Sequence, residues 1–249
     1  MIPGIQVSSL RPLLKTPGQV SEAFTRFAQM GCKVVQLQWI DPAVPLEHIA
    51  QALKDAGLTS VSVQDFYTEV IANLEYYTKL CTLTGSEWLC VSRIPESYKT
   101  AQGIIDYARE LDRLADTIAP MGIKLCFHPT SPDYGVIGGH TLVDALMDAA
   151  QCPLHLCLDF YHIWKSGIFM PGLLYQYRSR VCMVHFKDYL GDELVPAGQG
   201  EINWRPAIDA CIDTGVDYGF VEQETWSRDP FDCMSEAFSW LSEKLGVII

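Results

Sequence analysis

Four ionisable side chains stand at the ends of short apolar runs in the second half of the sequence. They are His128 in "IKLCFHP", Asp159 in "HLCLDF", His185 in "CMVHFKD" and Glu222 in "YGFVEQE". Removing several charged groups from water is costly unless they are paired or bind a cation. Carboxylate and imidazole groups together suit a divalent metal such as Mn²⁺, Mg²⁺, Co²⁺ or Zn²⁺. The residue types therefore indicate a metal site.

Each of these residues also has a structural interpretation of its own. Asp159 is a good N-cap for a helix that follows its strand. His185 could be a core histidine bonded to a backbone carbonyl, and Glu222 could pair with Lys187. These interpretations weaken when four such residues end four separate strands, because their positions then need a common explanation.

The elements that must position these residues alternate along the whole chain. Strand patterns are found at 2–8, 34–39, 60–64, 88–92, 123–128, 154–159, 181–185 and 219–222. Helical patterns include 19–30, 46–56, 101–119, 141–150, 207–214 and 230–245. Eight strand-then-helix units in 249 residues are typical of a (β/α)8 TIM barrel forming one domain over 1–249. A doubly wound open sheet is less consistent with the sequence, since the GxGxxG turn is absent.

Residues at the C-terminal ends of barrel strands meet at one face, where TIM barrels carry their active sites. The predicted fold therefore brings His128, Asp159, His185 and Glu222 together. Aromatic residues that follow other strand ends could wall a sugar-sized pocket, namely Trp39, Phe66 and Trp226. Arg93 and Arg228 follow strands as candidate anion anchors.

The composition of the chain limits the kinds of molecule that the protein is expected to bind. The chain has 30 acidic and 18 basic residues and a net charge of −12, which argues against a nucleic-acid partner. No apolar stretch approaches the roughly 20 residues of a membrane span. The N-terminus lacks the order of a signal peptide, so we expect a cytoplasmic protein with reduced cysteines in its core.

Four segments in the C-terminal half carry a family resemblance. "LDFYHIWKSG", "VHFKDY", "PAGQGEINW" and "FVEQE" resemble, in this order, the D-x-x-H, H-x-K-D, G-x-G-x-I and V-E elements of the xylose isomerase-like barrel superfamily, the sugar phosphate isomerase/epimerase group. The resemblance implies one divalent metal, most commonly Mn²⁺, held by Asp159, His185 and Glu222. It also implies substrate contacts from His162 and Lys187. Members are often dimers or tetramers, so a homo-oligomer is an open expectation.

One segment departs from the family pattern. Many members have a glutamate at the end of strand five that is both a metal ligand and an acid–base group. Here the segment reads "CFHPTSPDYG", so His128 ends the strand and Asp133 is the nearest carboxylate. Either His128 or Asp133 could be the fourth ligand. Further substrate contacts are predicted for Gln199, Trp39 and Arg93.

The predicted chemistry is proton transfer next to the carbonyl of a small sugar or cyclitol. A metal stabilises the developing enediolate, while Glu222 and His128 act as base and acid. The product is that of a sugar isomerase or epimerase. The altered strand-five segment keeps a second possibility, in which the enediolate expels a leaving group, as in a dehydratase or lyase acting on a 3-keto sugar or cyclitol. A third is a non-catalytic sugar-binding barrel.

A nuclease function is disfavoured. The fold group also resembles apurinic endonucleases, whose trinuclear zinc site needs more histidines and carboxylates than this chain places at its strand ends. The chain has six histidines in all, and three of them, at 48, 140 and 155, lie away from the predicted strand ends.

Overall fold

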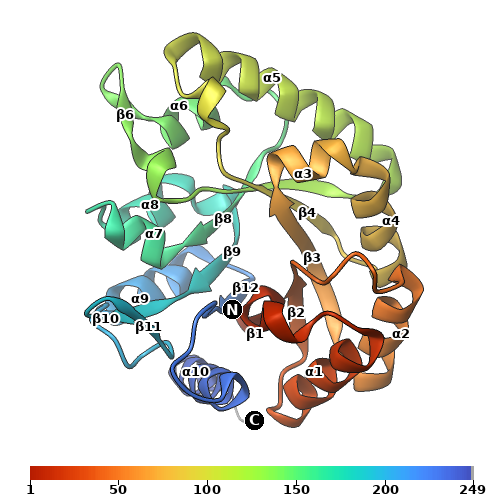
Figure 1. Ribbon diagram of the computed structural model, residues 1–249. Coiled ribbons are helices and arrows are strands. Elements are labelled where there is room, and N and C mark those ends of the chain that lie inside the picture. Colours follow the sequence, from red (N-terminus) through yellow and green to blue (C-terminus); the bar gives the residue numbers. More distant parts are fainter. Residues whose placement is uncertain (248–249) are drawn as a thin grey trace.

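In the computed structural model, which describes residues 1–247, the chain forms a closed parallel barrel (Figure 1). The barrel strands are β1 (Ile2–Gln6), β2 (Val34–Leu37), β3 (Thr59–Phe66), β4 (Trp88–Ser92), β5 (Lys124–His128), β8 (His155–Asp159), β9 (Val181–Phe186) and β12 (Tyr218–Val221). Each strand pairs with its neighbours in this order, and β12 closes the barrel on β1. The predicted TIM barrel is confirmed.

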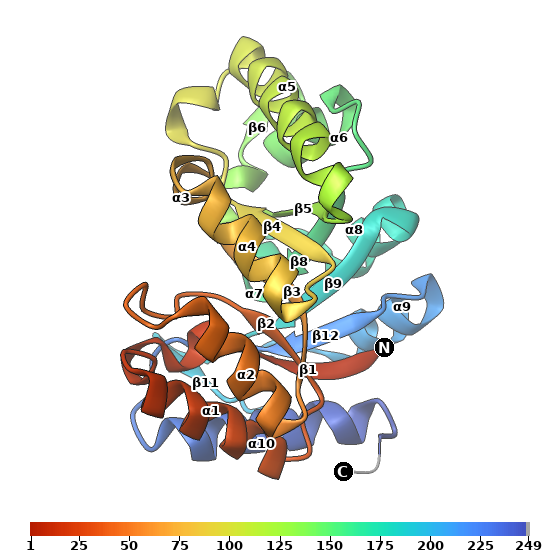
Figure 2. The same ribbon diagram turned by 90° about the vertical axis from the view of Figure 1, so that its right-hand side faces the viewer.

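Helices surround the barrel on its outer side (Figures 1 and 2). They are α1 (Pro17–Gln29), α2 (Leu46–Ala56), α3 (Tyr67–Ala72), α4 (Leu74–Thr84), α5 (Ala101–Ile118), α6 (Leu142–Ala149), α7 (Phe160–Lys165), α8 (Met170–Tyr177), α9 (Arg205–Thr214) and α10 (Pro230–Lys244). Short 3₁₀ turns are η1 (Val7–Leu13), η2 (Glu96–Tyr98), η3 (Ala119–Met121), η4 (Ser131–Tyr134) and η5 (Arg178–Arg180). Two small hairpins complete the fold: β6 (Val136–Ile137) with β7 (His140–Thr141), and β10 (Asp188–Leu190) with β11 (Glu193–Val195).

Element boundaries follow from local chemistry. Gly57 and Gly122 end their helices in the left-handed conformation, with φ of 67° and 76°, as the Gly-Leu and Gly-Ile turns predict. The first strand ends at Gln6, two residues earlier than its apolar pattern suggests, because the chain turns into η1 at Val7. That turn brings Ser8 within hydrogen-bond distance of Glu222.

The side chains inside the barrel change from apolar to polar and then to ionisable toward the C-terminal ends of the strands. One layer is apolar and contains Cys90, Cys126, Cys157 and Cys182, all buried as free thiols. Buried glutamines on β1, β2 and β3 form a hydrogen-bonded chain of amides. The ionisable residues follow at the C-terminal end. None of the helices described is long and apolar enough to span a membrane.

Candidate active site

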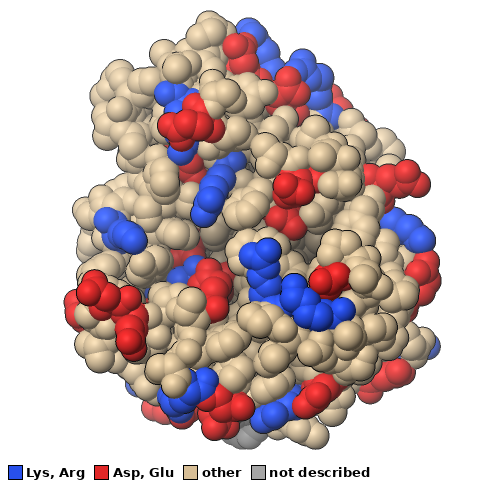
Figure 3. All heavy atoms as spheres, in the orientation of Figure 1, with Lys and Arg blue, Asp and Glu red and all other residues tan. Residues whose placement is uncertain are grey.

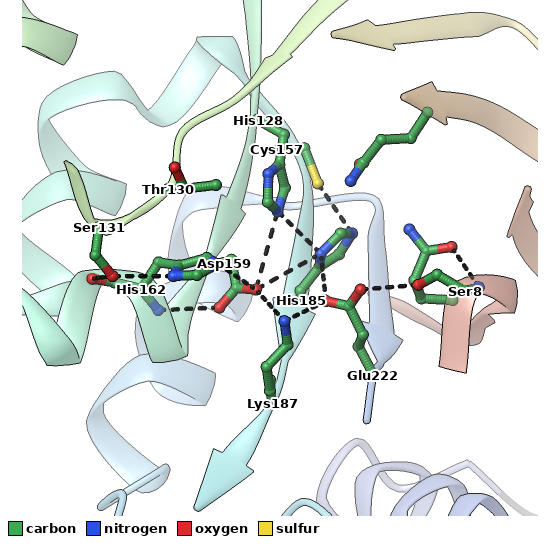
Figure 4. A network of polar contacts seen from close by, with 12 residues as sticks. Ser8, His128, Thr130, Ser131, Cys157, Asp159, His162, His185, Lys187 and Glu222 are labelled. Carbon is green, nitrogen blue, oxygen red and sulfur yellow. Dashed lines mark hydrogen bonds and ion pairs between the residues drawn. The ribbon is translucent and has the colours of Figure 1, made fainter. Parts of the chain in front are cut away.

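Three of the predicted metal ligands meet where β8, β9 and β12 end (Figure 4). His185 Nδ1 lies 3.2 Å from Glu222 Oε2 and 3.9 Å from Asp159 Oδ2. One ligand atom of each residue lies within 4.8 Å of the other two, and all three residues are buried. The closure of the barrel thus brings together residues that are up to 63 positions apart, from Asp159 to Glu222.

The donor set fits a divalent cation. Asp159 Oδ2 and Glu222 Oε2 are buried and form no hydrogen bond with the residues that the structure describes, although Lys187 Nζ lies 3.4 and 3.1 Å from them as an ion-pair partner. Buried carboxylates are costly unless their charge is compensated, and a divalent cation would add positive charge to that of Lys187. Two carboxylate oxygens and one imidazole nitrogen are suitable ligands, and three protein ligands leave further positions open to substrate.

Asp159 combines the two interpretations that its sequence position allowed. Its Oδ1 accepts a hydrogen bond from the backbone N–H of His162 at 3.1 Å and caps the N-terminus of α7. Its Oδ2 faces His185 and Lys187. One carboxylate therefore fixes the helix with one oxygen and offers the other to the cluster.

Lys187 is the cation present among these carboxylates. Its Nζ lies 3.4 Å from Asp159 Oδ2, 3.1 Å from Glu222 Oε2 and 2.6 Å from Glu224 Oε1. Burial acts to lower the pKa of Lys187, but the three carboxylates outweigh it and raise the pKa well above its usual value. Burial likewise opposes ionisation of Glu222, yet the Lys187 ammonium holds the pKa of Glu222 well below its usual value. The Glu222–Lys187 pair considered from the sequence is thus present within the cluster.

His128 extends the cluster on the β5 side. Its Nε2 lies 3.2 Å from His185 Nδ1 and 3.9 Å from Asp159 Oδ2. Burial and the neighbouring His185 lower the pKa of His128 to about 3, so the ring is neutral near pH 7. A neutral imidazole offers a lone pair to a metal or a proton.

The structure gives Asp133 a different set of partners. Its Oδ2 accepts hydrogen bonds from the Thr130 N–H and hydroxyl at 2.8 and 3.0 Å. Its Oδ1 accepts from the Ile94 N–H at 3.2 Å and lies 3.6 Å from Lys99 Nζ. The Asp133 carboxylate closes the η4 turn, and of the two predicted candidates for fourth ligand His128 is the one at the cluster.

His162 reaches the same carboxylate from the first turn of α7. Its Nε2 lies 3.9 Å from Asp159 Oδ2, and its Nδ1 lies 2.9 Å from the Ser131 hydroxyl. Burial is the main cause that lowers the pKa of His162. The residue is held from both ends and is partly exposed, as a substrate contact requires.

The other residues predicted to contact substrate have partners outside the carboxylate–histidine cluster. Gln199 Nε2 donates a hydrogen bond to Glu236 at 2.8 Å, and Arg228 pairs with the same carboxylate, so the structure does not bring either to the cluster. Trp226 donates to the Ser9 and Gln223 carbonyls. Trp39 and Arg93 follow β2 and β4, on either side of Phe66.

Three residues without a predicted site role complete the site. Gln36 Oε1 lies 2.5 Å from His185 Nε2, and Ser8 donates a hydrogen bond to Glu222 Oε1 at 2.9 Å. Glu224 binds Lys187. The E-x-E spacing could have identified Glu224, because residues two apart on an extended chain share a face. Ser8 ends the predicted strand 2–8 and Gln36 is a polar residue of the predicted strand 34–39, so their place near the mouth of the barrel had a local signal but their partners did not.

The closed barrel and its buried carboxylate–histidine cluster define a TIM barrel with ionisable residues where this fold carries active sites. The family model described as a xylose isomerase-like TIM barrel matches residues 24–244. The chain belongs to this family, as the sequence resemblance predicted.

Individual known proteins are similar to the chain over part or all of its length. It is 30% identical over 152 residues to an inosose dehydratase of Geobacillus kaustophilus, a match over 55% of this chain and 48% of that protein. The chain thus spans about half of that relative's length. A sugar phosphate isomerase/epimerase from Parabacteroides distasonis has a similar fold, with a TM-score of 0.80, 18% identity and 96% coverage of both chains.

A third similar protein has been solved with a bound metal. The IOLI protein, whose crystal structure holds a zinc atom, matches with a TM-score of 0.79 and 15% identity over 99% of this chain and 98% of its own. At these identities the two structural matches establish the shared fold.

Proposed function

We propose that the protein is a metal-dependent sugar isomerase or epimerase that acts through an enediolate. The observation that carries the proposal is the convergence of Asp159 Oδ2, His185 Nδ1 and Glu222 Oε2 at one buried point at the C-terminal end of the barrel. These three residues would hold one divalent cation. Mn²⁺ is the first candidate, with Zn²⁺, Co²⁺ and Mg²⁺ as alternatives.

A divalent cation at this point would supply Lewis acidity to the substrate carbonyl and its neighbouring hydroxyl. The chain's own residues would move the protons. Glu222 is held by Ser8 and faces the cluster, so it is placed to take or return the proton next to the carbonyl. His128, neutral near pH 7, would serve on the β5 side. Lys187 would stabilise negative charge on substrate oxygen.

The first experiment measures metal in the parent protein and in the Asp159→Asn variant, both purified without an affinity tag. We expect about one equivalent of Mn, Zn, Co or Mg per parent chain and its loss in the variant. The metal-loaded parent should then catalyse deuterium uptake from D₂O into keto sugars or keto cyclitols. Metal binding without exchange would favour a non-catalytic sugar-binding barrel. Failure to bind metal would overturn the mechanism.

A dehydratase or lyase is the second candidate. His128 stands where many family members have their second acid–base carboxylate, and the similarity to an inosose dehydratase covers 55% of the chain. The same first proton transfer would then lead to loss of water from a 3-keto sugar or cyclitol. NMR in D₂O separates the two reactions: isomerisation or epimerisation keeps every hydroxyl, whereas dehydration yields an unsaturated ketone with new ultraviolet absorbance.

A further inference from the structure

Four side chains form a continuous stack at the mouth of the barrel. The guanidinium of Arg11 lies 4.6 Å from the ring centroid of Trp39, and that of Arg93 lies 4.7 Å from the ring centroid of Phe66. The Trp39 and Phe66 centroids are 5.7 Å apart. The stack therefore joins residues at or just after the ends of β1, β2, β3 and β4, with a guanidinium at each end.

Part of this stack is held in a strained backbone conformation. In residues 1–247, Trp39 and Arg93 are the two non-glycine residues with positive φ, at 57° and 62°. Such conformations persist where the surroundings enforce them, and they gather at functional sites. Asp65 provides one such restraint, since its carboxylate accepts hydrogen bonds from Trp39 Nε1 at 3.2 Å and from the Tyr77 hydroxyl at 2.8 Å.

The two guanidiniums differ from the third arginine that follows a strand end. Arg228 forms two hydrogen bonds with Glu236. Within the described part of the chain, Arg11 and Arg93 have no carboxylate within salt-bridge distance and no hydrogen bond from their guanidiniums. The protein has 30 acidic residues for 18 basic ones, so carboxylates are abundant. Both guanidiniums are exposed, are held against aromatic rings and keep their hydrogen-bond donors free, so they are available to an anion from outside the chain.

Arg93 is the end of the stack that lies nearest the cluster. Its backbone N–H donates to the His128 carbonyl at 3.2 Å, and Ser92 and His128 are direct neighbours across β4 and β5. Arg93 also lines a recess of about 510 Å³ together with Ser92, Glu96 and Lys99, and it is the cation of this recess without a carboxylate partner among residues 1–247, since Lys99 pairs with Glu96 and Asp133. Lys and Arg side chains lie near the middle of this face of the molecule, with Asp and Glu side chains between them (Figure 3).

We propose that the substrate is an anionic keto sugar whose phosphate or carboxylate is bound by Arg93. The inference rests on the proposed function, because it identifies the substrate class of the same site. The planar guanidinium suits bidentate contact with either anion. The Phe66 ring packs against the Arg93 guanidinium. The Arg11 guanidinium packs in the same way against the Trp39 ring, which would form a second wall of the substrate pocket. Phosphate and carboxylate share this chemistry, so the probes must separate them.

The test measures binding by calorimetry in saturating MnCl₂ with D-fructose 6-phosphate, 5-keto-D-gluconate and D-fructose as probes. Deuterium uptake from D₂O is followed in the same samples. The variants are Arg93→Gln and Arg93→Lys, with Arg109→Gln on the outer face of α5 as a control of equal charge change. Arg93→Gly is included because glycine relieves the positive φ and keeps the loop foldable.

We expect the parent to bind at least one anionic probe 10- to 100-fold more tightly than D-fructose. Arg93→Gln and Arg93→Gly should remove this preference, Arg93→Lys should keep part of it, and Arg109→Gln should keep all of it. The probe that is preferred identifies the anion as phosphate or carboxylate. Equal binding of neutral and anionic probes, or a preference that survives in Arg93→Gln, would overturn the proposal.

The two proposals fail in different ways. Deuterium uptake into D-fructose that Arg93→Gln leaves unchanged would support the enediolate function and refute the anion site. Binding of an anionic probe that depends on Arg93, without exchange in any probe, would support the anion site and count against the isomerase or epimerase function.

Discussion

Gln36 Oε1 lies 2.5 Å from His185 Nε2, on the side of the imidazole opposite to the carboxylate cluster. Because an amide oxygen is an acceptor, this contact favours the tautomer that carries its proton on Nε2 and leaves the Nδ1 lone pair toward Asp159 and Glu222. Gln36 is in turn held by Gln6 and Gln64 through hydrogen bonds of 3.0 Å each. A chain of hydrogen-bonded amides therefore fixes the orientation of the His185 ring, a candidate metal ligand.

The first prediction concerns this orientation. Gln36→Leu should weaken Co²⁺ or Zn²⁺ binding by about 10- to 100-fold, the usual effect of removing a partner of a metal-bound histidine. Calorimetry and the visible spectrum of bound Co²⁺ provide the measurement. Gln38→Leu is the matched control, because Gln38 lies farther along the amide chain and bonds Gln64 rather than His185. Equal weakening in both variants would contradict an orienting role for Gln36.

The second prediction separates the two oxygens of Asp159. Asparagine is as good an N-cap as aspartate, so Asp159→Asn should keep the helix cap while it loses metal affinity. Asp159→Ala should lose both and cost about 1 kcal/mol more in unfolding free energy, measured by urea denaturation of the metal-free proteins. Equal stability of the two variants would show that the cap contributes little.

The third prediction concerns charge balance at the cluster. In metal-free protein, Lys187→Met leaves Asp159 and Glu222 buried without their ammonium partner and should lower the unfolding free energy by about 3 kcal/mol. Saturating Mn²⁺ should reduce this loss, since the cation replaces the missing positive charge. Urea denaturation with EDTA and with Mn²⁺ gives the comparison. A loss of the same size in both conditions would mean that no cation binds at these oxygens.

The fourth prediction is a pH dependence. The pKa of His128 is lowered by burial from 6.5 to about 3, so between these values the unfolded chain binds more protons than the folded one and stability falls as pH falls. For metal-free protein the loss from His128 between pH 7.5 and pH 5 is about 2 kcal/mol. In His128→Gln the same pH change should cost less by about this amount. Identical pH slopes for parent and variant would contradict a depressed pKa.

Much of the fold was determined by local sequence. Most of the later barrel strands are short apolar runs that end at or next to an ionisable residue, which is why His128, Asp159, His185 and Glu222 could be predicted to share one face. The period of two along a strand also explains why Lys187 lies with His185 at the cluster. These signals depend only on neighbours in the chain.

Only the tertiary structure decided which side chains meet. Ser8 and Glu222 are 214 residues apart and become partners because β12 closes on β1. The Asp133 carboxylate is held by the backbone N–H groups of Thr130 and Ile94, and Arg228 is neutralised by Glu236, whereas Arg93 has no acidic partner among residues 1–247. Residue type and spacing determined which groups stand at the mouth of the barrel. Barrel closure and competition among hydrogen-bond donors decided which carboxylate oxygens were left for a cation.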